Sequence, residues 1–315
     1  MTEPLVYLKG EMIPASRAHL NIFDQGIVLG ATVTEMVRTF RHSLFRLDEH
    51  LDRLYRSMKY MQFDTGHSKS ELSAKVTELV AHNCGLIDQK DELGLVIFVT
   101  PGENRMYAGG AAMGANLTPT LCAHTFPLPF EYWAKKMETG SHLVIASTRH
   151  VPPQCYHPNM KYRSRMHYYL ADLEARKVDP EAAALLLDLD GNVTETSGSN
   201  FLIVEQGKIV SPTLRNTLPG VSRQVVIELA EKLGIPVEVR DFQAFQAINA
   251  DEAMTTTTPY CVMPVTKINQ LPIGTGKPGP VVRQLQQAWS EMVGFDIFEQ
   301  IQAGAIRRYS THAHA

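Results

Sequence analysis

The sequence predicts an α+β protein of two domains, because short β-branched segments alternate with segments of helical periodicity along most of the chain. Its 315 residues are 44% hydrophobic, which is enough to bury more than one core. Three prolines, Pro119, Pro127 and Pro129, mark a change in composition. We therefore expect three parts, namely a small N-terminal domain at residues 1–125, a linker at 126–137 and a large C-terminal domain at 138–315.

The composition argues against several classes of protein. A formal net charge of −3 gives no reason to expect nucleic acid or a membrane surface as a partner. No apolar run approaches the ~18 residues of a membrane span, and the N-terminus lacks a basic-then-apolar signal, so we expect a cytoplasmic protein. The cysteines are scattered without a CxxC pair, which favours reduced thiols and no metal site.

The first half of the chain alternates short strands with helices. Lys9-Gly10 separates two apolar runs and predicts a tight hairpin. Apolar residues at helical spacing predict a helix over residues 49–61, and Ser68 with Glu71 forms a capping box that opens a second helix. Strands are expected at residues 5–8, 11–13, 32–40 and 93–100.

The second half continues this pattern after a stretch at residues 101–115 that is rich in Gly, Ala and Asn. A loop of that length in a compact domain often lines a site. Asp190-Gly191 predicts another hairpin. Strands are expected at residues 142–148, 182–189, 192–195, 200–204, 255–258 and 262–268, and helices at 164–177, 222–233 and 280–293.

A lysine and a glutamate, Lys161 and Glu195, carry the most chemical information in the chain. A lysine amine can hold an aldehyde as a Schiff base. A carboxylate can pair with a protonated pyridine nitrogen and keep the ring an electron sink. The two therefore suit pyridoxal phosphate, although a single lysine is usually solvated and a glutamate before Thr, Ser and Gly is usually a turn residue.

A phosphate ester needs a fixed cation and several hydrogen-bond donors. Arg53 lies beside the apolar face of its predicted helix, where the ordinary alternative is a surface arginine. A Pro-Gly pair before the helix at 222–233 bares backbone N–H groups, and with Ser222 as the expected cap this makes an anion site. Thr257 and Thr258 add hydroxyls, although simple filling of a strand would also explain them.

In this order, the segments resemble the class-IV aminotransferases, the fold-type IV pyridoxal-phosphate enzymes. That family includes branched-chain and D-amino-acid aminotransferases, (R)-amine transaminases and aminodeoxychorismate lyase. The resemblance runs from Val6 to about Ile268. Its motifs are Phe23–Gly26 with Glu35, Phe45–Leu54, Lys161, Glu195–Phe201, Leu218–Arg223 and Thr257–Pro264.

The resemblance implies two α/β domains with pyridoxal 5′-phosphate between them, in a homodimer whose sites border the subunit interface. It implies a branched-chain-aminotransferase-like transaminase that moves an amino group between an amino acid (or amine) and a 2-oxo acid. A D-amino-acid or (R)-amine transaminase, a lyase on the same scaffold and a non-catalytic dimeric binding protein remain alternatives.

The resemblance also implies a role for each matching residue. Lys161 would be the Schiff-base lysine and the proton shuttle, and Glu195 would pair with the pyridine nitrogen. Arg53 would hold the phosphate, and Leu218 would pack against the ring. The phosphate would also meet the backbone and side chains of Val221, Ser222, Thr257 and Thr258.

The sequence departs from its relatives at one cofactor position. Many of them have a tyrosine five residues after the lysine, hydrogen-bonded to the ring phenolic oxygen, where this chain has Met166. A thioether cannot donate that bond. We expect Arg163, Arg165 or a water molecule to replace it.

The substrate subtype stays open at the sequence level. Branched-chain enzymes favour an aromatic residue before Glu35 and glycine after it, whereas this chain has Thr34 and Met36. D-amino-acid enzymes use tyrosine at the Thr34 position, with arginine and histidine in the loop after the strand at 93–100. The candidates for substrate contact are Arg105, Arg38, Glu35 and Thr34, and the alternative for Arg38 is a surface strand arginine.

Overall fold

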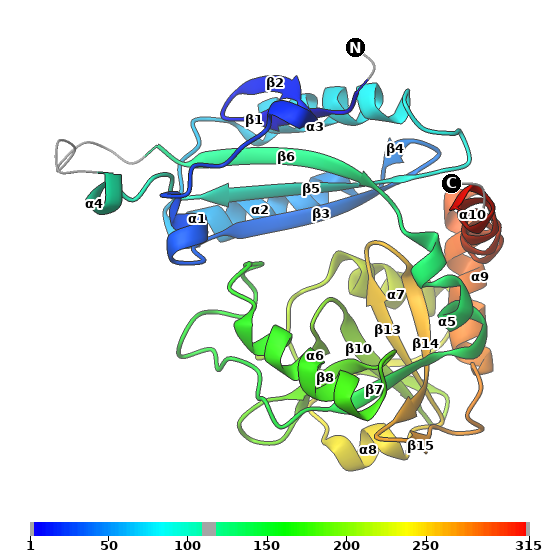
Figure 1. Ribbon diagram of the computed structural model, residues 1–315. Helices are drawn as coiled ribbons and strands as arrows, with labels where there is room; N and C mark the ends of the chain where they lie inside the picture. Colours follow the sequence, from blue (N-terminus) through cyan, green and yellow to red (C-terminus); the bar gives the residue numbers. More distant parts are fainter. Residues whose placement is uncertain (1–2, 109–117, 313–315) are drawn as a thin grey trace. The chain divides into compact units, whose positions relative to one another are not determined.

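The computed structural model describes residues 3–108 and 118–312, without the side chains of Arg105, Ala108 and residues 308–312. The chain divides into two compact units. Unit 1 is Met1–Leu128 with Met160–Ser164, and unit 2 is Pro129–Asn159 with Arg165–Ala315 (Figure 1). The division after Leu128 falls inside the expected linker. The sequence pattern does not predict that the five residues around Lys161 group with unit 1.

Unit 1 is built on an antiparallel sheet of long and short strands, in which the described strands follow the order β2-β1-β6-β5-β3-β4. Helices α2 (Leu47–Met61) and α3 (Lys69–Cys84) lie against each other and against this sheet. The strands are β1 (Leu5–Leu8), β2 (Glu11–Pro14), β3 (Val33–Phe40), β4 (Ser43–Leu44), β5 (Leu93–Thr100) and β6 (Thr120–Pro127).

Local sequence explains most of these elements. Lys9 and Gly10 both have positive φ, at 51° and 96°, which is the backbone that the predicted tight hairpin requires. The capping box of Ser68 and Glu71 is confirmed at the start of α3. The prediction missed β6, because prolines were interpreted as a change in composition, whereas Pro119 and Pro127 lie at the two ends of this strand. Of the loop predicted at residues 101–115, residues 101–108 are described and include the short helix α4 (Arg105–Ala108), whereas 109–115 lie outside the described residues.

Unit 2 holds a sheet that closes on itself. Along the described chain the order is β12-β11-β10-β13-β14-β7-β8-β9, and β9 pairs with β10 as well as with β8. The strands are β7 (Ser141–Ile145), β8 (Ala183–Leu187), β9 (Val193–Thr196), β10 (Asn200–Glu205), β11 (Lys208–Ser211), β12 (Val237–Val239), β13 (Glu252–Thr257), β14 (Cys261–Ile268) and β15 (Leu271–Pro272), which pairs with β14. This closure places the β9–β10 connection beside the end of β13.

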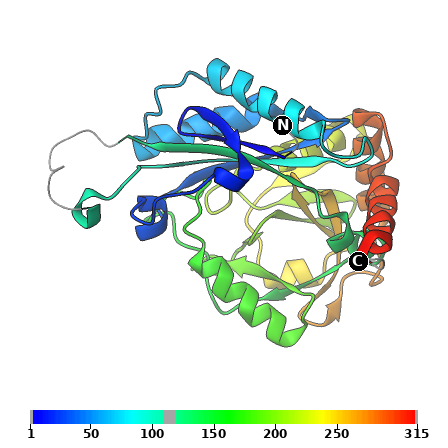
Figure 2. The same cartoon turned by 45° about the horizontal axis from the view of Figure 1, so that its top comes forward.

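Helices cover the sheet of unit 2. Helix α6 (Met166–Val178) packs along β7 and β8 (Figure 2), and α7 (Val221–Lys232) packs against β13. Helix α9 (Pro280–Val293) matches its predicted bounds, whereas the final helix α10 (Ile297–His312) was not predicted. The helices α5 (Ala134–Thr139) and α8 (Ala244–Ile248) complete the unit. The core under this cover includes fully buried Phe201, Ile203 and Leu185.

Candidate active site

The segment that carries Lys161 is fixed to unit 1 through its backbone. Thr34 N–H donates to the Lys161 carbonyl at 2.8 Å, and Arg163 N–H donates to the Thr32 carbonyl at 3.0 Å. The Lys161 N–H donates to Ser57 Oγ at 3.3 Å. These bonds extend the edge of β3 by a short antiparallel bridge. The half-buried side chain of Lys161 therefore starts from a backbone that is held at both of its polar groups.

Glu35 and Arg53 form a buried ion pair in unit 1. The Arg53 Nε donates to Glu35 Oε1 at 2.6 Å, and its Nη2 donates to Oε2 at 2.8 Å. Glu35 is 0% exposed and Arg53 is 4% exposed, so the surface-arginine alternative is excluded. Burial alone would raise the pKa of Glu35, but the charge and hydrogen bonds of Arg53 hold that pKa far below its ordinary value.

His50 completes this cluster. Its Nδ1 lies 2.8 Å from Glu35 Oε2, and its side chain is 1% exposed. Burial lowers the pKa of His50, the bond to Glu35 opposes this, and the positive charges of Arg53 and Lys161 lower the pKa further. The imidazole is therefore neutral at neutral pH and donates from Nδ1 to the carboxylate. The predicted phosphate contact of Arg53 and substrate contact of Glu35 stay predictions, but the two side chains clearly orient each other.

Two other substrate candidates of unit 1, Thr34 and Arg38, are buried in it. Thr34 Oγ1 donates to the Ile97 carbonyl at 2.9 Å and accepts from Arg163 Nε at 3.2 Å. Arg38 is 1% exposed, so it is not a surface arginine, and its guanidinium lies 3.9 Å from the centre of the Phe40 ring. Arg105 opens the short helix α4 (Arg105–Ala108), and its side chain lies outside the described residues.

In unit 2, Glu195 is held at both carboxylate oxygens. It lies on β9 and is 7% exposed. The Tyr168 hydroxyl donates to its Oε1 at 2.9 Å. Its Oε2 accepts from Asn200 Nδ2 and from the Leu218 N–H, each at 3.1 Å. Three donors from three separate segments thus fix the direction of one acidic group, which a turn residue would not need.

A histidine that the sequence did not single out lies behind this carboxylate. His150 Nε2 is 2.9 Å from the Tyr168 hydroxyl oxygen and 3.5 Å from Glu195 Oε1. Its Nδ1 is 2.9 Å from the Val151 carbonyl oxygen. Burial alone would lower the pKa of His150, but the hydrogen bond and charge of Glu195 outweigh it and raise that pKa. The sequence offers no local signal for this contact, because His150, Tyr168 and Glu195 belong to separate elements.

The N-terminus of α7 has the features of an anion site. Its N-cap is Gly220, without a side-chain cap and without an acidic residue in the first turn, so the prediction that Ser222 caps this helix was wrong. A Cβ at Gly220 would clash with Asn200 Oδ1, so a larger residue would displace the side chain that holds Glu195. The helix therefore starts with N–H groups that no side chain at the cap position satisfies.

Thr257 ends β13, the strand on which α7 packs, and its Oγ1 donates to the Gly198 carbonyl at 2.7 Å. This bond ties the threonine pair to the loop that follows Glu195. Thr257 and the half-buried Thr258 thus lie at the end of β13, whereas Val221 and Ser222 begin α7, the helix that packs against this strand. An oriented carboxylate and an uncapped helix N-terminus, joined through Asn200 and Leu218, fit the pyridine nitrogen and the phosphate of pyridoxal phosphate.

The positions of Met166 and its neighbours do not show which group takes the place of the tyrosine hydroxyl found in many relatives. Met166 opens α6 and is 69% exposed. Arg165 Nη1 donates to the Ser197 carbonyl at 3.2 Å within unit 2, whereas Arg163 lies over the Phe98 ring in unit 1. The arginine that would replace the phenol therefore stays a prediction.

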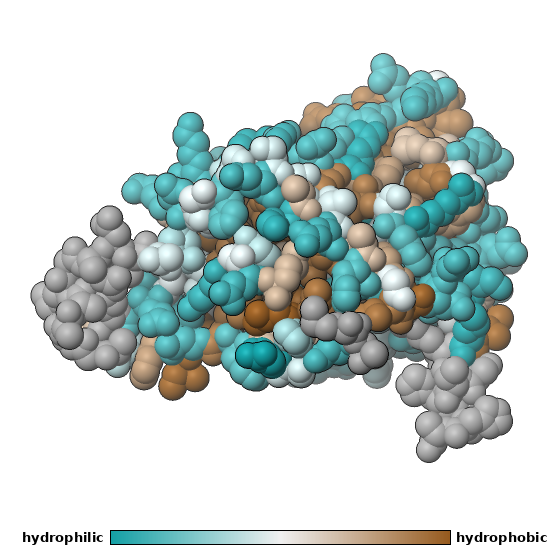
Figure 3. All heavy atoms as spheres, turned by 90° about the horizontal axis from the view of Figure 1, so that it is seen from above, coloured by the Kyte–Doolittle hydropathy of each residue, from teal (hydrophilic) through white to brown (hydrophobic). Residues whose placement is uncertain are grey.

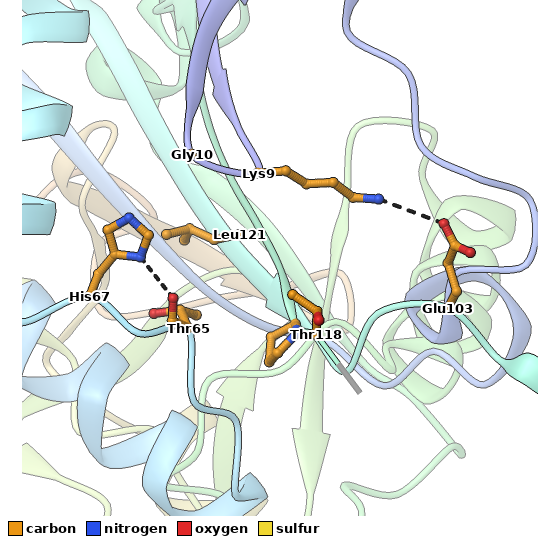
Figure 4. Close-up of a pocket in the computed structure, with 8 residues that line it drawn as sticks. Lys9, Gly10, Thr65, His67, Glu103, Thr118 and Leu121 are labelled. Atoms are coloured by element: carbon orange, nitrogen blue, oxygen red, sulfur yellow. Dashed lines mark hydrogen bonds and ion pairs between the residues drawn. The ribbon is translucent and has the colours of Figure 1, made fainter. Parts of the chain in front are cut away.

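Unit 1 also contains a hollow of about 320 Å³ (Figure 4). Lys9 and Glu103 form an ion pair of 3.7 Å at one side of it, and His67 Nδ1 lies 2.9 Å from the Thr65 carbonyl at the other. Its lining contains none of the residues that the sequence predicts for the cofactor or the substrate. We assign it no part in the function proposed below.

Comparison with known proteins identifies the family. The family model described as amino-transferase class IV matches residues 32–268, and the chain belongs to this family. It is a pyridoxal-phosphate-dependent aminotransferase of fold-type IV, as the sequence motifs predict. No helix among the described residues is long and apolar enough to cross a membrane.

Individual relatives cover most of the chain. It is 31% identical to the D-alanine aminotransferase of Bacillus licheniformis, over 90% of this chain and 95% of that protein. It is 30% identical to the branched-chain-amino-acid aminotransferase-like protein 1 of Arabidopsis thaliana over 91% of this chain, but spans only 50% of that protein.

Solved structures agree on the fold. The T.th. branched-chain amino acid aminotransferase, complexed with N-(5′-phosphopyridoxyl)-L-glutamate, is similar with a TM-score of 0.81 and 27% identity, over 93% of this chain and 95% of that one. The Escherichia coli branched-chain amino acid aminotransferase gives a TM-score of 0.85 at 24% identity, over 92% and 95% of the two chains. The second likeness supports the fold alone.

Proposed function

We propose that this aminotransferase moves the amino group of a branched-chain type of amino acid to a 2-oxo acid. The observation that carries the chemistry is the buried Glu195 carboxylate with both oxygens held. The substrate class is supported by the branched-chain aminotransferases among its relatives and structural neighbours. The D-alanine aminotransferase relative favours a D-amino acid as the second candidate substrate.

Lys161 and Glu195 have different proposed roles toward the cofactor. When bound, pyridoxal 5′-phosphate supplies an aldehyde that links to amines and a ring that withdraws electrons from the substrate α-carbon. Lys161 would hold that aldehyde in the resting protein, and its amine, set free when the substrate amine replaces it, would be the group that moves a proton at the substrate α-carbon. Its amine can accept the proton only in its neutral form. Glu195 is proposed to keep the ring nitrogen protonated.

Other residues are proposed to bind and orient. Arg53, turned by its bidentate pair with Glu35, would hold the phosphate together with the start of α7 and the threonine pair. These cofactor-binding residues are Arg53, Leu218, Val221, Ser222, Thr257 and Thr258. Arg105, Arg38, Glu35 and Thr34 remain the candidates for substrate contact, and the two arginines are the candidates for the substrate carboxylate, since an arginine fork matches a carboxylate geometrically.

We also propose a homodimer. Several apolar side chains are exposed beside one another in unit 1, where Gln25 N–H donates to Gly102 O and Asn104 N–H donates to Phe23 O. They belong to the segment with α1 (Gln25–Val28) and to α4, and Figure 3 shows apolar side chains gathered at this end. They are Ile22, Ile27, Leu29, Met106 and Tyr107, each at least 56% exposed.

Four free cysteines support the cytoplasm as the proposed compartment.

The test is a set of half-reactions with purified protein and stoichiometric cofactor. L-leucine, D-alanine and an (R)-amine are each mixed with the protein, and the 2-oxo product and the aminated cofactor are quantified. We expect equal amounts of both products, with L-leucine fastest. Product release without amination of the cofactor would indicate a lyase, and D-alanine as the fastest donor would favour the second candidate. No reaction with any donor would contradict the proposal.

A further inference from the structure

The Tyr168 hydroxyl lies between two partners, and it has one proton to donate. Its oxygen is 2.9 Å from Glu195 Oε1 and 2.9 Å from His150 Nε2. If the proton goes to an ionised Glu195, the contact with His150 is a hydrogen bond only when Nε2 carries a proton of its own. The geometry therefore links the protonation of His150 to that of the carboxylate.

The second nitrogen of His150 completes the proton count. Its Nδ1 lies 2.9 Å from the Val151 carbonyl oxygen, which can only accept, so Nδ1 also carries a proton. Satisfying all of these contacts with Glu195 ionised requires an imidazolium. A neutral His150 leaves one of the two contacts at the Tyr168 hydroxyl without a proton.

A positive charge on His150 is compatible with its burial, because an anion lies beside it. His150 is 2% exposed, and both Tyr168 and Glu195 are 7% exposed. A buried imidazolium needs a paired anion, and Glu195 Oε1 lies 3.5 Å from its Nε2. The interaction between the two groups raises the pKa of His150 despite its burial, and the charge of Asp188 acts in the same direction.

Two further titratable groups lie near this pair, His167 on α6 and Arg165 at the N-cap of that helix. The His167 ring centre lies 5.5 Å from that of His150. Burial, with the charge of His150, lowers the pKa of His167 to about 4, so His167 is neutral where His150 titrates. The Arg165 guanidinium lies 6.0 Å from the Tyr168 ring centre.

We propose that Tyr168 and His150 are positioning residues for Glu195. The imidazolium of His150 acts through the Tyr168 hydroxyl to hold the carboxylate in one orientation. This inference deepens the proposed function and rests on it, because Glu195 meets the cofactor only there. When His150 loses its proton, the carboxylate loses the cation behind it, and the Tyr168 proton can then go to His150 Nε2 instead of to Glu195.

The direct test is nitrogen-15 NMR of the histidine side chains in the full-length holoenzyme, titrated over pH. His150→Gln identifies the signal, and Glu195→Gln and Tyr168→Phe test its coupling. We expect both His150 nitrogens to be protonated at neutral pH, with a midpoint that moves down in each coupling variant. His142→Gln is the matched control, because His142 is also buried and contacts a carboxylate, Asp179, at 2.8 Å. It should leave the His150 signal unchanged.

The rate of the half-reaction distinguishes a role of Tyr168 and His150 in positioning Glu195 from a role in packing alone. Tyr168→Phe keeps the ring and removes the hydroxyl, so the half-reaction should slow by roughly tenfold, the scale of one hydrogen bond to a charged group. His150→Gln keeps a donor toward Tyr168 without a titratable charge. It should therefore keep more rate than Tyr168→Phe and lose the pH dependence that His150 contributes.

The outcomes distinguish this inference from the function on which it rests. A His150 with one protonated nitrogen at neutral pH, or a midpoint that ignores both coupling variants, would overturn the positioning role while leaving transamination intact. Failure of the wild-type protein to aminate its cofactor would instead contradict the proposed function. A coupling variant that fails to fold is replaced by Tyr168→Trp, whose indole N–H donates but cannot accept from His150.

Discussion

Two buried carboxylates, Glu35 of unit 1 and Glu195 of unit 2, show how similar surroundings serve different purposes. Each has a histidine beside it, at 2.8 Å for His50 and 3.5 Å for His150. Glu35, however, is saturated by a bidentate arginine, whereas Glu195 is held by a phenol, an amide and a backbone N–H. A carboxylate neutralised by a permanent cation can only orient that cation. Glu195 is held by neutral donors at both oxygens, and the proposed His150 imidazolium lies farther away, at 3.5 Å, so Glu195 keeps charge to offer to a pyridinium.

The same contrast appears in the two histidines. His50 faces Arg53 and Lys161 as well as Glu35, and its pKa is lowered. His150 interacts chiefly with Glu195, and its pKa is raised. Burial has the largest influence on both and lowers both pKa values. At His50 the charges of Arg53 and Lys161 add to it, whereas at His150 the interactions with Glu195 and Asp188 outweigh it. We infer that the cluster of unit 1 is built for a fixed charge state and that of unit 2 for one that changes.

Removing the Lys161 amine should reduce turnover more than any other change considered for the two clusters. Lys161→Ala should abolish turnover, because the proposed covalent link and proton transfer both use its amine. Borohydride reduction of the wild-type holoenzyme, followed by peptide mapping, should label the peptide that contains Lys161. Label on any other lysine would refute the assignment.

Breaking the ion pair of unit 1 should mainly cost stability and cofactor binding. Arg53→Ala leaves Glu35 buried without its cation, which typically costs about 3–5 kcal/mol. It also removes a proposed phosphate contact, and charge-assisted bonds contribute about 1.5–3 kcal/mol each. Urea unfolding and equilibrium dialysis against phosphate measure the two effects. Cofactor retention equal to that of the wild type would place the phosphate elsewhere.

A double replacement sharpens that result. Arg53→Met combined with Glu35→Leu removes both buried charges, so it should recover much of the lost stability. Cofactor retention should stay low, because the phosphate would still lack its cation. Recovery of both properties would mean that Arg53 serves the fold alone.

The two clusters should respond to opposite ends of the pH scale. The folded pKa of Glu35 is lowered, so its stabilisation is complete above the ordinary value of 4.5 and is lost as the pH falls below it. The folded pKa of His150 is raised, so its stabilisation is complete below the ordinary 6.5 and is lost as the pH rises through the raised value. Urea unfolding across pH should show a shallower acid loss in Glu35→Gln and a shallower alkaline loss in His150→Gln. Parallel curves for variants and wild type would remove the electrostatic distinction.

The smallest effect is expected at the substrate carboxylate. Arg105→Ala should raise the apparent KM for amino and 2-oxo acids and leave the cofactor spectrum unchanged. An amine donor without a carboxylate should be unaffected. Equal loss with amines and acids would assign this segment to folding or closure, and no loss with either would move the role to Arg38.

Candidate residues that lie in a short sequence motif could be predicted from the sequence. Contacts between residues of separate elements could not. Lys161 and Glu195 could be singled out as candidates because each lies in a short motif, and their roles stay predictions. Glu35 and Arg53 were both singled out, but their pairing depends on α2 packing against β3, which no local pattern encodes. His150 and Tyr168 were missed for the same reason. Segment 160–164 is too short for periodicity to show that it joins the sheet of unit 1.

The central claim is that Glu195 serves the chemistry and Glu35 the structure. Its most direct test is the rate of the single half-reaction with L-leucine in Glu195→Gln and Glu35→Gln, each saturated with cofactor. We predict that Glu195→Gln slows the reaction by at least about 100-fold, or roughly 2.7 kcal/mol, because an amide cannot stabilise a pyridinium cation. Glu35→Gln should lose stability but stay within about tenfold of the wild-type rate. An unchanged rate in Glu195→Gln, or the larger rate loss in Glu35→Gln, would contradict the account.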